Sequence, residues 1–174
     1  KRLARKCTNF TIELVQDQHK ITGPFAGGYM IDAYSLWAPD KIIRIQEDAS
    51  ALFSPDLYDE FLRKEDDMQA SALPYNLIHL HSSSLHLLDR ILNVESLNCI
   101  QINKDAGGTE IESELPYFKR VQDTGRRLLI RGKLSREDLN LLRRDLSPRG
   151  LYVQTVVETP EETEALKEFF RPWR

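Results

Sequence analysis

Cysteine is scarce in this chain of 174 residues, which contains only Cys7 and Cys99. Two cysteines are too few for a disulfide framework, and such usage is typical of the reducing cytoplasm, where we expect the protein to reside. No apolar run approaches the roughly 20 residues that a membrane-spanning helix needs, and no signal-peptide pattern is visible. These absences argue against a disulfide-stapled secreted module and predict that no membrane is a partner.

An excess of basic residues is also missing. Lys and Arg number 24 against 27 Asp and Glu, which gives a net charge of -3. Because no basic stripe alternates with aromatic residues, we predict no nucleic-acid partner. The glycine-rich stretch 23–28 lacks the Lys-Ser/Thr ending of a phosphate-binding loop, so we expect a lid or turn there. A content of 41% hydrophobic and 29% charged residues is typical of one globular domain, here 1–174.

What the sequence does contain is a repeated unit. An amphipathic helical pattern and the lid segment occupy 1–40, and from 41 to 174 a short apolar strand pattern is followed each time by a helical one. The strands are expected at 42–48, 75–81, 99–103, 128–132 and 151–157. Helix starts are marked by Ser54-Pro55, by the capping box Ser135–Asp138 and by Thr159-Pro160. Five strand-then-helix units in succession imply a parallel sheet.

Polar residues recur at i and i+2 near the carboxyl end of each strand, and such pairs share one face. The pairs are Gln46 and Asp48, His79 and His81, Gln101 and Asn103, Arg131 and Lys133, and Tyr152 and Gln154. An open doubly wound sheet would bury this polarity beneath helices at a high cost in free energy. In a (β/α)8 barrel the same positions point inward at the mouth, where active sites are built. We therefore favour an α/β fold in which the chain supplies about five strand-helix units of a (β/α)8 TIM barrel, with an open sheet as the alternative.

The polar residues of the predicted barrel mouth form the candidate site. We interpret His79 and His81 as acid/base groups or metal ligands, and Asp48 as a carboxylate that orients them. Two imidazoles are an incomplete zinc set, so Asp48, Asp105 or a group outside this sequence would have to complete it. A hydrogen-bonded polar cluster without metal is the alternative.

The remaining polar side chains are candidates for substrate binding. They are Gln46, Gln101, Asn103, Arg131, Lys133 and Gln154. Arg131 and Lys133 suit a small substrate that carries a carboxylate or a phosphate, and Arg131 would clamp the anion. Ion pairs with Asp48 or Asp105 inside the barrel would also account for both cations.

Short motifs with a fixed order and spacing follow one another from Trp37 onward. They are Gln46-Glu47-Asp48-Ala49-Ser50, Ser54-Pro55, Tyr58-Asp59-Glu60-Phe61, Ile78-His79-Leu80-His81, Ile130-Arg131-Gly132-Lys133-Leu134 and Thr159-Pro160-Glu161-Glu162. This set is similar in order and spacing to the carboxyl-terminal half of the uroporphyrinogen decarboxylase superfamily. That superfamily includes the decarboxylases of haem biosynthesis and the cobalamin-linked methyltransferases, both (β/α)8 barrels. The resemblance therefore implies the same fold that the strand pattern predicts.

The chain departs from both branches of that superfamily. On the strand that corresponds to 76–81, the methyltransferase branch carries a His-x-Cys pair that binds zinc together with a Cys of the last strand and activates a thiol. Here the pair is His79 and His81, and the last strand has no Cys. We expect Cys99 to face the helices, where it could not complete a zinc site. The decarboxylases carry a His-containing loop after the last strand and a catalytic Asp in their amino-terminal half, and neither is visible in this sequence.

The resemblance implies an enzyme that transfers a methyl group, linked to a corrinoid or a thiol, or carries out related lyase chemistry on a small anionic substrate at the mouth. It also implies zinc at His79 and His81 and a corrinoid carried by a partner protein. The alternatives are uroporphyrinogen decarboxylase activity proper, a non-catalytic ligand-binding member of the same fold, and a scaffold domain. Barrel closure needs eight strands, so we expect the missing barrel half to come from a longer chain of roughly 300 residues or from a second copy.

Overall fold

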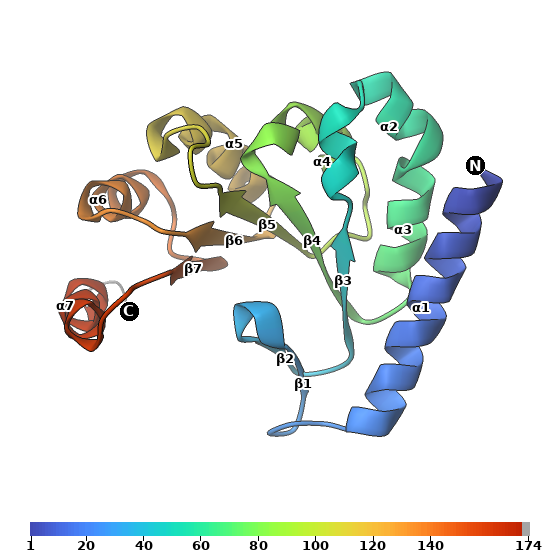
Figure 1. Ribbon diagram of the computed structural model, residues 1–174, viewed down its shortest axis with the longest axis horizontal. Helices are drawn as coiled ribbons and strands as arrows, with labels where there is room; N and C mark the ends of the chain where they lie inside the picture. Colours follow the sequence, from blue (N-terminus) through green and yellow to red (C-terminus); the bar gives the residue numbers. More distant parts are fainter. Residues whose placement is uncertain (172–174) are drawn as a thin grey trace.

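The computed structural model describes residues 1–171, and its centre is a five-stranded parallel sheet (Figure 1). The strands are β3 (Ile42–Gln46), β4 (Tyr75–His81), β5 (Cys99–Lys104), β6 (Arg127–Gly132) and β7 (Leu151–Thr155). They lie side by side in sequence order, each pair of neighbours is parallel, and helices connect them. The predicted α/β fold with alternating strands and helices is therefore confirmed, and the sheet is compatible with part of an α/β barrel.

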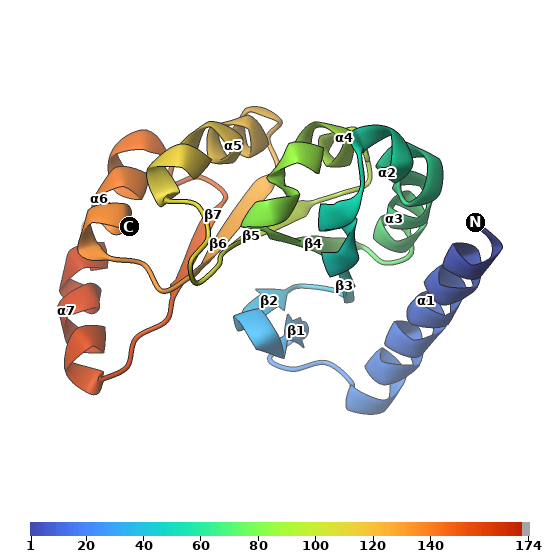
Figure 2. The same ribbon diagram turned by 45° about the horizontal axis from the view of Figure 1, so that its top comes forward.

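The helices that connect and follow the strands are η2 (Asp48–Leu52), α2 (Pro55–Phe61), α3 (Arg63–Ser71), η3 (Ser82–Leu87), α4 (Leu88–Leu92), α5 (Ile111–Asp123), α6 (Arg136–Asp145) and α7 (Pro160–Phe170). The helices α2 to α6 pack on one face of the sheet. The other face carries no helix of this group and is partly covered by the hairpin of β1 and β2, and it is called the uncovered face below. Figure 2 shows α2 to α6 on one side of the sheet and the hairpin of β1 and β2 on the other. Ser54, Ser135 and Thr159 cap α2, α6 and α7 as predicted, because each side chain accepts a hydrogen bond from a backbone N–H of the first turn.

The core lies between the sheet and these helices. Ile45, Ile78, Ile100 and Leu128 form one row across four strands in register, and each is almost fully buried. Burying an aliphatic side chain of this size contributes roughly 1.5–3 kcal/mol. Side chains alternate between the two faces along a strand. Because this row points toward the helices, the residues on either side of it in each strand, many of them polar, point toward the uncovered face.

Helix α1 (Arg2–Thr22) lies at the edge of the sheet formed by β3. The Arg5 guanidinium forms a bidentate ion pair with Glu65 of α3, with N–O distances of 2.8 and 3.0 Å. Near the other end of α1, His19 Nε2 donates to the carbonyl oxygen of Ile42 at 2.8 Å. The amphipathic helix predicted from the sequence is therefore present, and it is attached to both α3 and β3.

A small hairpin follows α1 and packs on the uncovered face of the sheet. It consists of β1 (Tyr29–Ile31), η1 (Asp32–Tyr34) and β2 (Leu36–Ala38), and a turn over 23–28 leads into it, as expected. Tyr34, Ile31 and Leu36 contact the sheet. Within residues 1–171, no helix combines the length and the apolar composition needed to cross a membrane.

Cys99 lies on the uncovered face, so the expectation that it faces the helices is wrong. It has the same strand parity as Gln101 and packs with Tyr34, Leu77 and Leu129. Burial raises the pKa of the Cys99 thiol to about 12. The thiol is therefore protonated at neutral pH, a form that does not ligate metal.

Candidate functional site

Two rows of side chains cross the uncovered face at the carboxyl ends of the strands. Register partners in the first row are Gln46, His79, Gln101, Leu129 and Tyr152. Partners in the second row are His81, Asn103, Arg131 and Gln154, with Asp48 just beyond the end of β3. The i, i+2 pattern of the sequence therefore brings together every predicted site residue except Lys133.

His79 and His81 lie side by side at the end of β4. Their ring centroids are 4.7 Å apart with the ring planes at 80°, and their Nε2 atoms are 3.2 Å apart. His79 is only 8% exposed, whereas His81 is 32% exposed and reaches solvent. Both share one face of the strand, as the alternation predicts.

A carboxylate fixes the proton of His81. His81 Nδ1 lies 2.7 Å from Asp105 Oδ1, which also accepts from Asn103 Nδ2, while Oδ2 accepts from the N–H and the hydroxyl of Ser82. Burial alone would raise the pKa of Asp105, but the hydrogen bonds from His81, Asn103 and Ser82 outweigh it and lower this pKa. Asp105 is thus ionised at neutral pH and accepts from Nδ1 of His81, so the tautomer of the neutral His81 ring that fits this contact has its lone pair on Nε2.

The proton of His79 is also on Nδ1. Its Nδ1 contacts the amide oxygen of Gln101 and lies 3.1 Å from the hydroxyl of Tyr34. Because an amide oxygen only accepts hydrogen bonds, Nδ1 carries the proton and Nε2 carries a lone pair. Burial, the largest effect, lowers the pKa of His79 and favours the neutral imidazole.

The two Nε2 lone pairs face each other and a carboxylate oxygen. Asp48 Oδ1 lies 3.4 Å from His81 Nε2 and 3.8 Å from His79 Nε2. Three acceptors this close repel one another unless a cation or a proton lies between them. Zinc bound tetrahedrally at 2.0–2.1 Å holds its ligand atoms about 3.3–3.4 Å apart, close to these separations. The donor set therefore fits a metal with three protein ligands and one open position, the arrangement typical of catalytic zinc.

Asp48 is positioned by the end of β3 and by Gln46. It is the first residue of η2, and its Oδ2 accepts from Gln46 Nε2 at 2.8 Å. This bond leaves Oδ1 to face the histidines. Because the Asp48 side chain is 52% exposed, solvent reaches this side of the cluster.

Arg131 stands on β6, two strands away from the histidines. Its Nη1 approaches Asn103 Oδ1 at 3.5 Å, and it pairs with no carboxylate of residues 1–171, so the internal ion pair considered from the sequence is not formed. Lys133 does not join the site, because β6 ends at Gly132 and the alternation ends with it. Its Nζ instead pairs with Glu158 on the surface at 2.5 Å, which leaves the predicted substrate role of Lys133 without support.

Sequence reasoning missed Tyr34, Arg44 and Ser82. Arg44 has the same parity as Gln46, so the i, i+2 pattern extended inward along β3 would have found it. Tyr34 arrives from the hairpin, 45 positions before His79, and no local pattern connects the two residues. Its ring lies 5.2 Å from the guanidinium carbon of Arg44.

A buried pair of carboxyl groups supports the end of β3 from the helix side. Burial and the neighbouring charge of Asp66 raise the pKa of Glu47 to about 10. Glu47 is therefore protonated at neutral pH, and the neighbouring Asp66 accepts a hydrogen bond from the hydroxyl of Tyr58 at 2.5 Å. Because Glu47 directly precedes Asp48, this pair anchors the backbone that carries Asp48.

The assembled site has the candidate metal ligands His79, His81 and Asp48 at one end. At the other end stands Arg131, which has no ion pair within residues 1–171, with Gln154 and Asn103 beside it in register. No protein-family model, no curated protein and no solved structure matches the chain.

Proposed function

We propose that the protein is an enzyme that holds zinc through His79, His81 and Asp48 and acts on a small anionic substrate at the open fourth position. The observation that carries this proposal is the distance of 3.2 Å between the Nε2 atoms of His79 and His81. In each ring an oxygen acceptor contacts Nδ1 and so leaves Nε2 as the nitrogen that can bind metal. Metal-bound histidines typically donate their other ring N–H to a carboxylate or carbonyl oxygen, the role that Asp105 and Gln101 have here.

Zinc at such a site supplies a Lewis acid that lowers the pKa of a bound thiol or water. The side chains of the protein set the geometry around it. Asp105 and Gln101 hold the two histidines in the tautomer that binds metal, and Gln46 keeps Asp48 turned toward them. Arg131 attracts and orients the anionic end of the substrate.

Among the reactions open to such a site, we favour methyl transfer to a thiol, with the methyl group delivered by a corrinoid on a partner protein. The support is the order of motifs that resembles the cobalamin-linked branch of the uroporphyrinogen decarboxylase superfamily, whose His-x-Cys strand corresponds to β4. Here His81 replaces the Cys and Asp48 supplies a third donor, so the ligands are two nitrogens and one oxygen. Decarboxylation is less favoured, because the His-containing loop that follows the last strand in the decarboxylases has no counterpart after β7 in this sequence.

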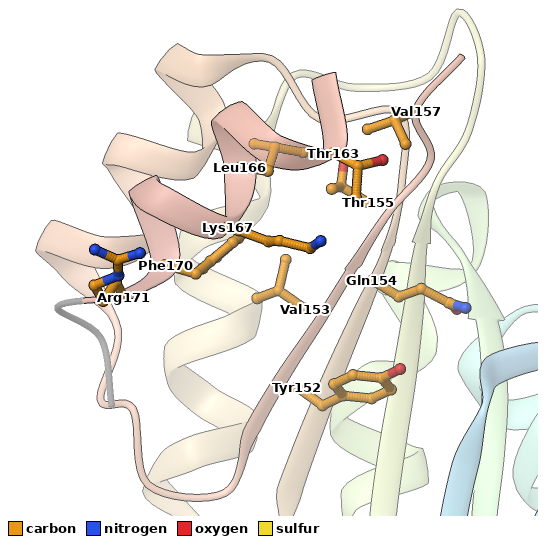
Figure 3. A pocket seen from close by; sticks show the side chains of 10 residues that line it. All are labelled: Tyr152, Val153, Gln154, Thr155, Val157, Thr163, Leu166, Lys167, Phe170 and Arg171. Carbon is orange, nitrogen blue, oxygen red and sulfur yellow. The ribbon is translucent and has the colours of Figure 1, made fainter. Parts of the chain in front are cut away.

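We also propose that the sheet is part of a (β/α)8 barrel, completed by the rest of a longer chain or by a second copy. Among residues 1–171, strands β3 and β7 each have one edge without a strand neighbour. A groove of about 530 Å³ lies between β7 and α7, with Val153 and Leu166 among its apolar residues (Figure 3). A second groove of about 340 Å³ lies between β3 and α1. Each groove borders an edge strand of the sheet, which supports the proposal that further strands pack there.

Zinc content and affinity test the metal site. Wild-type protein is expected to retain stoichiometric zinc after dialysis, measured by elemental analysis, and His79→Ala, His81→Ala and Asp48→Asn are expected to lose it. His86→Ala is a matched control, since both ring nitrogens of His86 contact backbone carbonyl oxygens on the surface. A wild-type protein without measurable zinc affinity would contradict the proposal and favour the non-catalytic alternative.

The reaction is tested with methylcobalamin as donor and a panel of small anionic thiols as acceptors. The thiol releases its proton to solvent, and its sulfur takes the methyl group as the cobalt–methyl bond breaks with its electron pair left on cobalt. Mass spectrometry follows the methyl thioether, and absorbance spectra follow the cob(I)alamin. The rate is expected to depend on zinc and to vanish in His81→Ala. Zinc binding without any thiol methylation would agree with the proposed metal site but would contradict methyl transfer to a thiol.

A further inference from the structure

Two guanidinium groups on the uncovered face have no counter-ion. The Nε atoms of Arg131 and Arg44 are both buried without a hydrogen-bond partner, and neither side chain forms an ion pair within residues 1–171. The two acidic residues of the site, Asp48 and Asp105, already accept hydrogen bonds from other side chains. Because an unpaired charge is costly to shield from water, a cation in this setting is normally matched by an anion.

Neutral donors without an acceptor accompany these cations. Gln101 is fully buried, and its Oε1 contacts His79 Nδ1 while its Nε2 has no acceptor. The Tyr34 hydroxyl lies beside the same Nδ1–H, from which it can only accept, so its own proton has no acceptor within residues 1–171. Gln154, the register partner of Arg131, has an acceptor, Oε1, without a donor within residues 1–171. Unused donors predominate, which is the pattern expected around an anion.

Three of these donors lie together next to His79, because the Tyr34 hydroxyl and the Gln101 amide both contact His79 Nδ1 and the Tyr34 ring lies 5.2 Å from the guanidinium carbon of Arg44. Tyr34 is held there because its carbonyl oxygen accepts from the Tyr152 hydroxyl at 3.0 Å, and Figure 3 shows Tyr152 and Gln154 pointing away from α7. Burial raises the pKa of Tyr34, while the positive charges of Arg44 and Arg131 oppose this effect. Arg131 lies on the same face one strand beyond Gln101, with its Nη1 3.5 Å from Asn103 Oδ1.

We propose that Tyr34, Arg44, Gln101 and Arg131 form an oxyanion subsite that receives a carboxylate, sulfonate or phosphate group of the substrate. The inference rests on the proposed function and deepens it, because it assigns the charged group of the substrate to particular donors. Two guanidiniums, an amide N–H and a hydroxyl offer more donors than a neutral ligand would satisfy. Since all of them belong to the protein, the subsite binds an anion without metal.

Inorganic sulfate, inorganic phosphate and acetate test the subsite when each is titrated into metal-free protein at an ionic strength held constant with chloride. At least one is expected to bind saturably by calorimetry and to raise the melting temperature, and the preferred anion distinguishes a tetrahedral from a planar group. Arg131→Gln is expected to weaken binding about 10- to 100-fold, the usual effect of losing hydrogen bonds to a charged group. Tyr34→Phe removes only a hydroxyl and is expected to weaken binding less.

Lys133→Gln is the matched control, because it removes a neighbouring cation that pairs with Glu158 on the surface, and it should bind anions like wild type. Arg131→Lys keeps the positive charge but loses the planar guanidinium and its paired N–H donors, so an anion affinity between those of wild type and Arg131→Gln is expected. This variant replaces Arg131→Gln in the test if Arg131→Gln fails to fold. Anion binding no tighter than that of chloride, or equal in wild type, Arg131→Lys and Tyr34→Phe, overturns the subsite. Zinc titrations of the same samples separate the two proposals, since a protein that binds anions but no zinc overturns the metal site alone.

Discussion

Replacing Asp105 with Asn is expected to loosen metal binding while the fold persists. Asp105 Oδ1 accepts the Nδ1 proton of His81, and Oδ2 accepts from the N–H and the hydroxyl of Ser82. An Asn side chain keeps one acceptor oxygen but places an NH2 donor where the other stood. That donor meets either the N–H of Ser82 or the N–H of His81, so His81 loses its fixed tautomer or its orientation.

The size of this effect follows from the contact of Asp105 with His81, which we propose to be a metal ligand. Removing such a partner typically costs 10- to 100-fold in metal affinity, or about 1.4–2.7 kcal/mol. The same change costs the folded state about 1 kcal/mol, the usual contribution of one hydrogen bond, because the Asp105 side chain is 26% exposed. Metal affinity should therefore fall much more visibly than stability.

Zinc affinity of Asp105→Asn is measured by competition with a chromophoric chelator, and stability by thermal unfolding with excess chelator. Asp67→Asn is the matched control, since Asp67 also accepts from a serine hydroxyl, that of Ser96, at 2.7 Å in another part of the molecule. Wild-type zinc affinity in Asp105→Asn, alongside a clear loss in His81→Ala, would refute the orienting role of Asp105.

Leu80→Ala is expected to lower the free energy of unfolding by about 2–5 kcal/mol and the melting temperature by roughly 4–20 °C, because Leu80 is buried beneath the helices. Zinc affinity measured by the same competition assay should be unchanged, and the opposite pattern would mean that the face assignment of β4 is inverted. The pKa of Glu47 is about 10 in the folded protein against an ordinary value of 4.5. The contribution of the protonated Glu47 to the free energy of unfolding is therefore complete below pH 4.5 and declines as the pH rises toward 10. Glu47→Gln, followed by urea unfolding between about pH 6 and 9, is expected to flatten this decline, and an unchanged slope would show that the Glu47–Asp66 pair is not its source.

Local patterns predict much of the site because the alternation of side chains along a strand is a property of the backbone itself. His79 and His81 share a face for this reason, and so do Gln101 and Asn103. Cys99 was predicted on the wrong face because its parity was counted as opposite to that of Gln101, although the two are the same. Lys133 was predicted on the site face because the alternation was extended beyond Gly132, where β6 ends. The pattern is therefore dependable only inside a strand and only when its parity is counted correctly.

The sequence by itself determined the strand-helix alternation, the helix caps and the single polar face, because each of these depends on residues a few positions apart. Only the tertiary structure decided which polar side chains meet. Asp105 reaches His81 from a position 24 residues away because β4 and β5 pair in one particular register, and Tyr34 reaches His79 because the hairpin packs against the sheet. Strand register and hairpin packing are set by burial of apolar side chains across the whole sheet, a long-range balance that no short stretch of sequence contains.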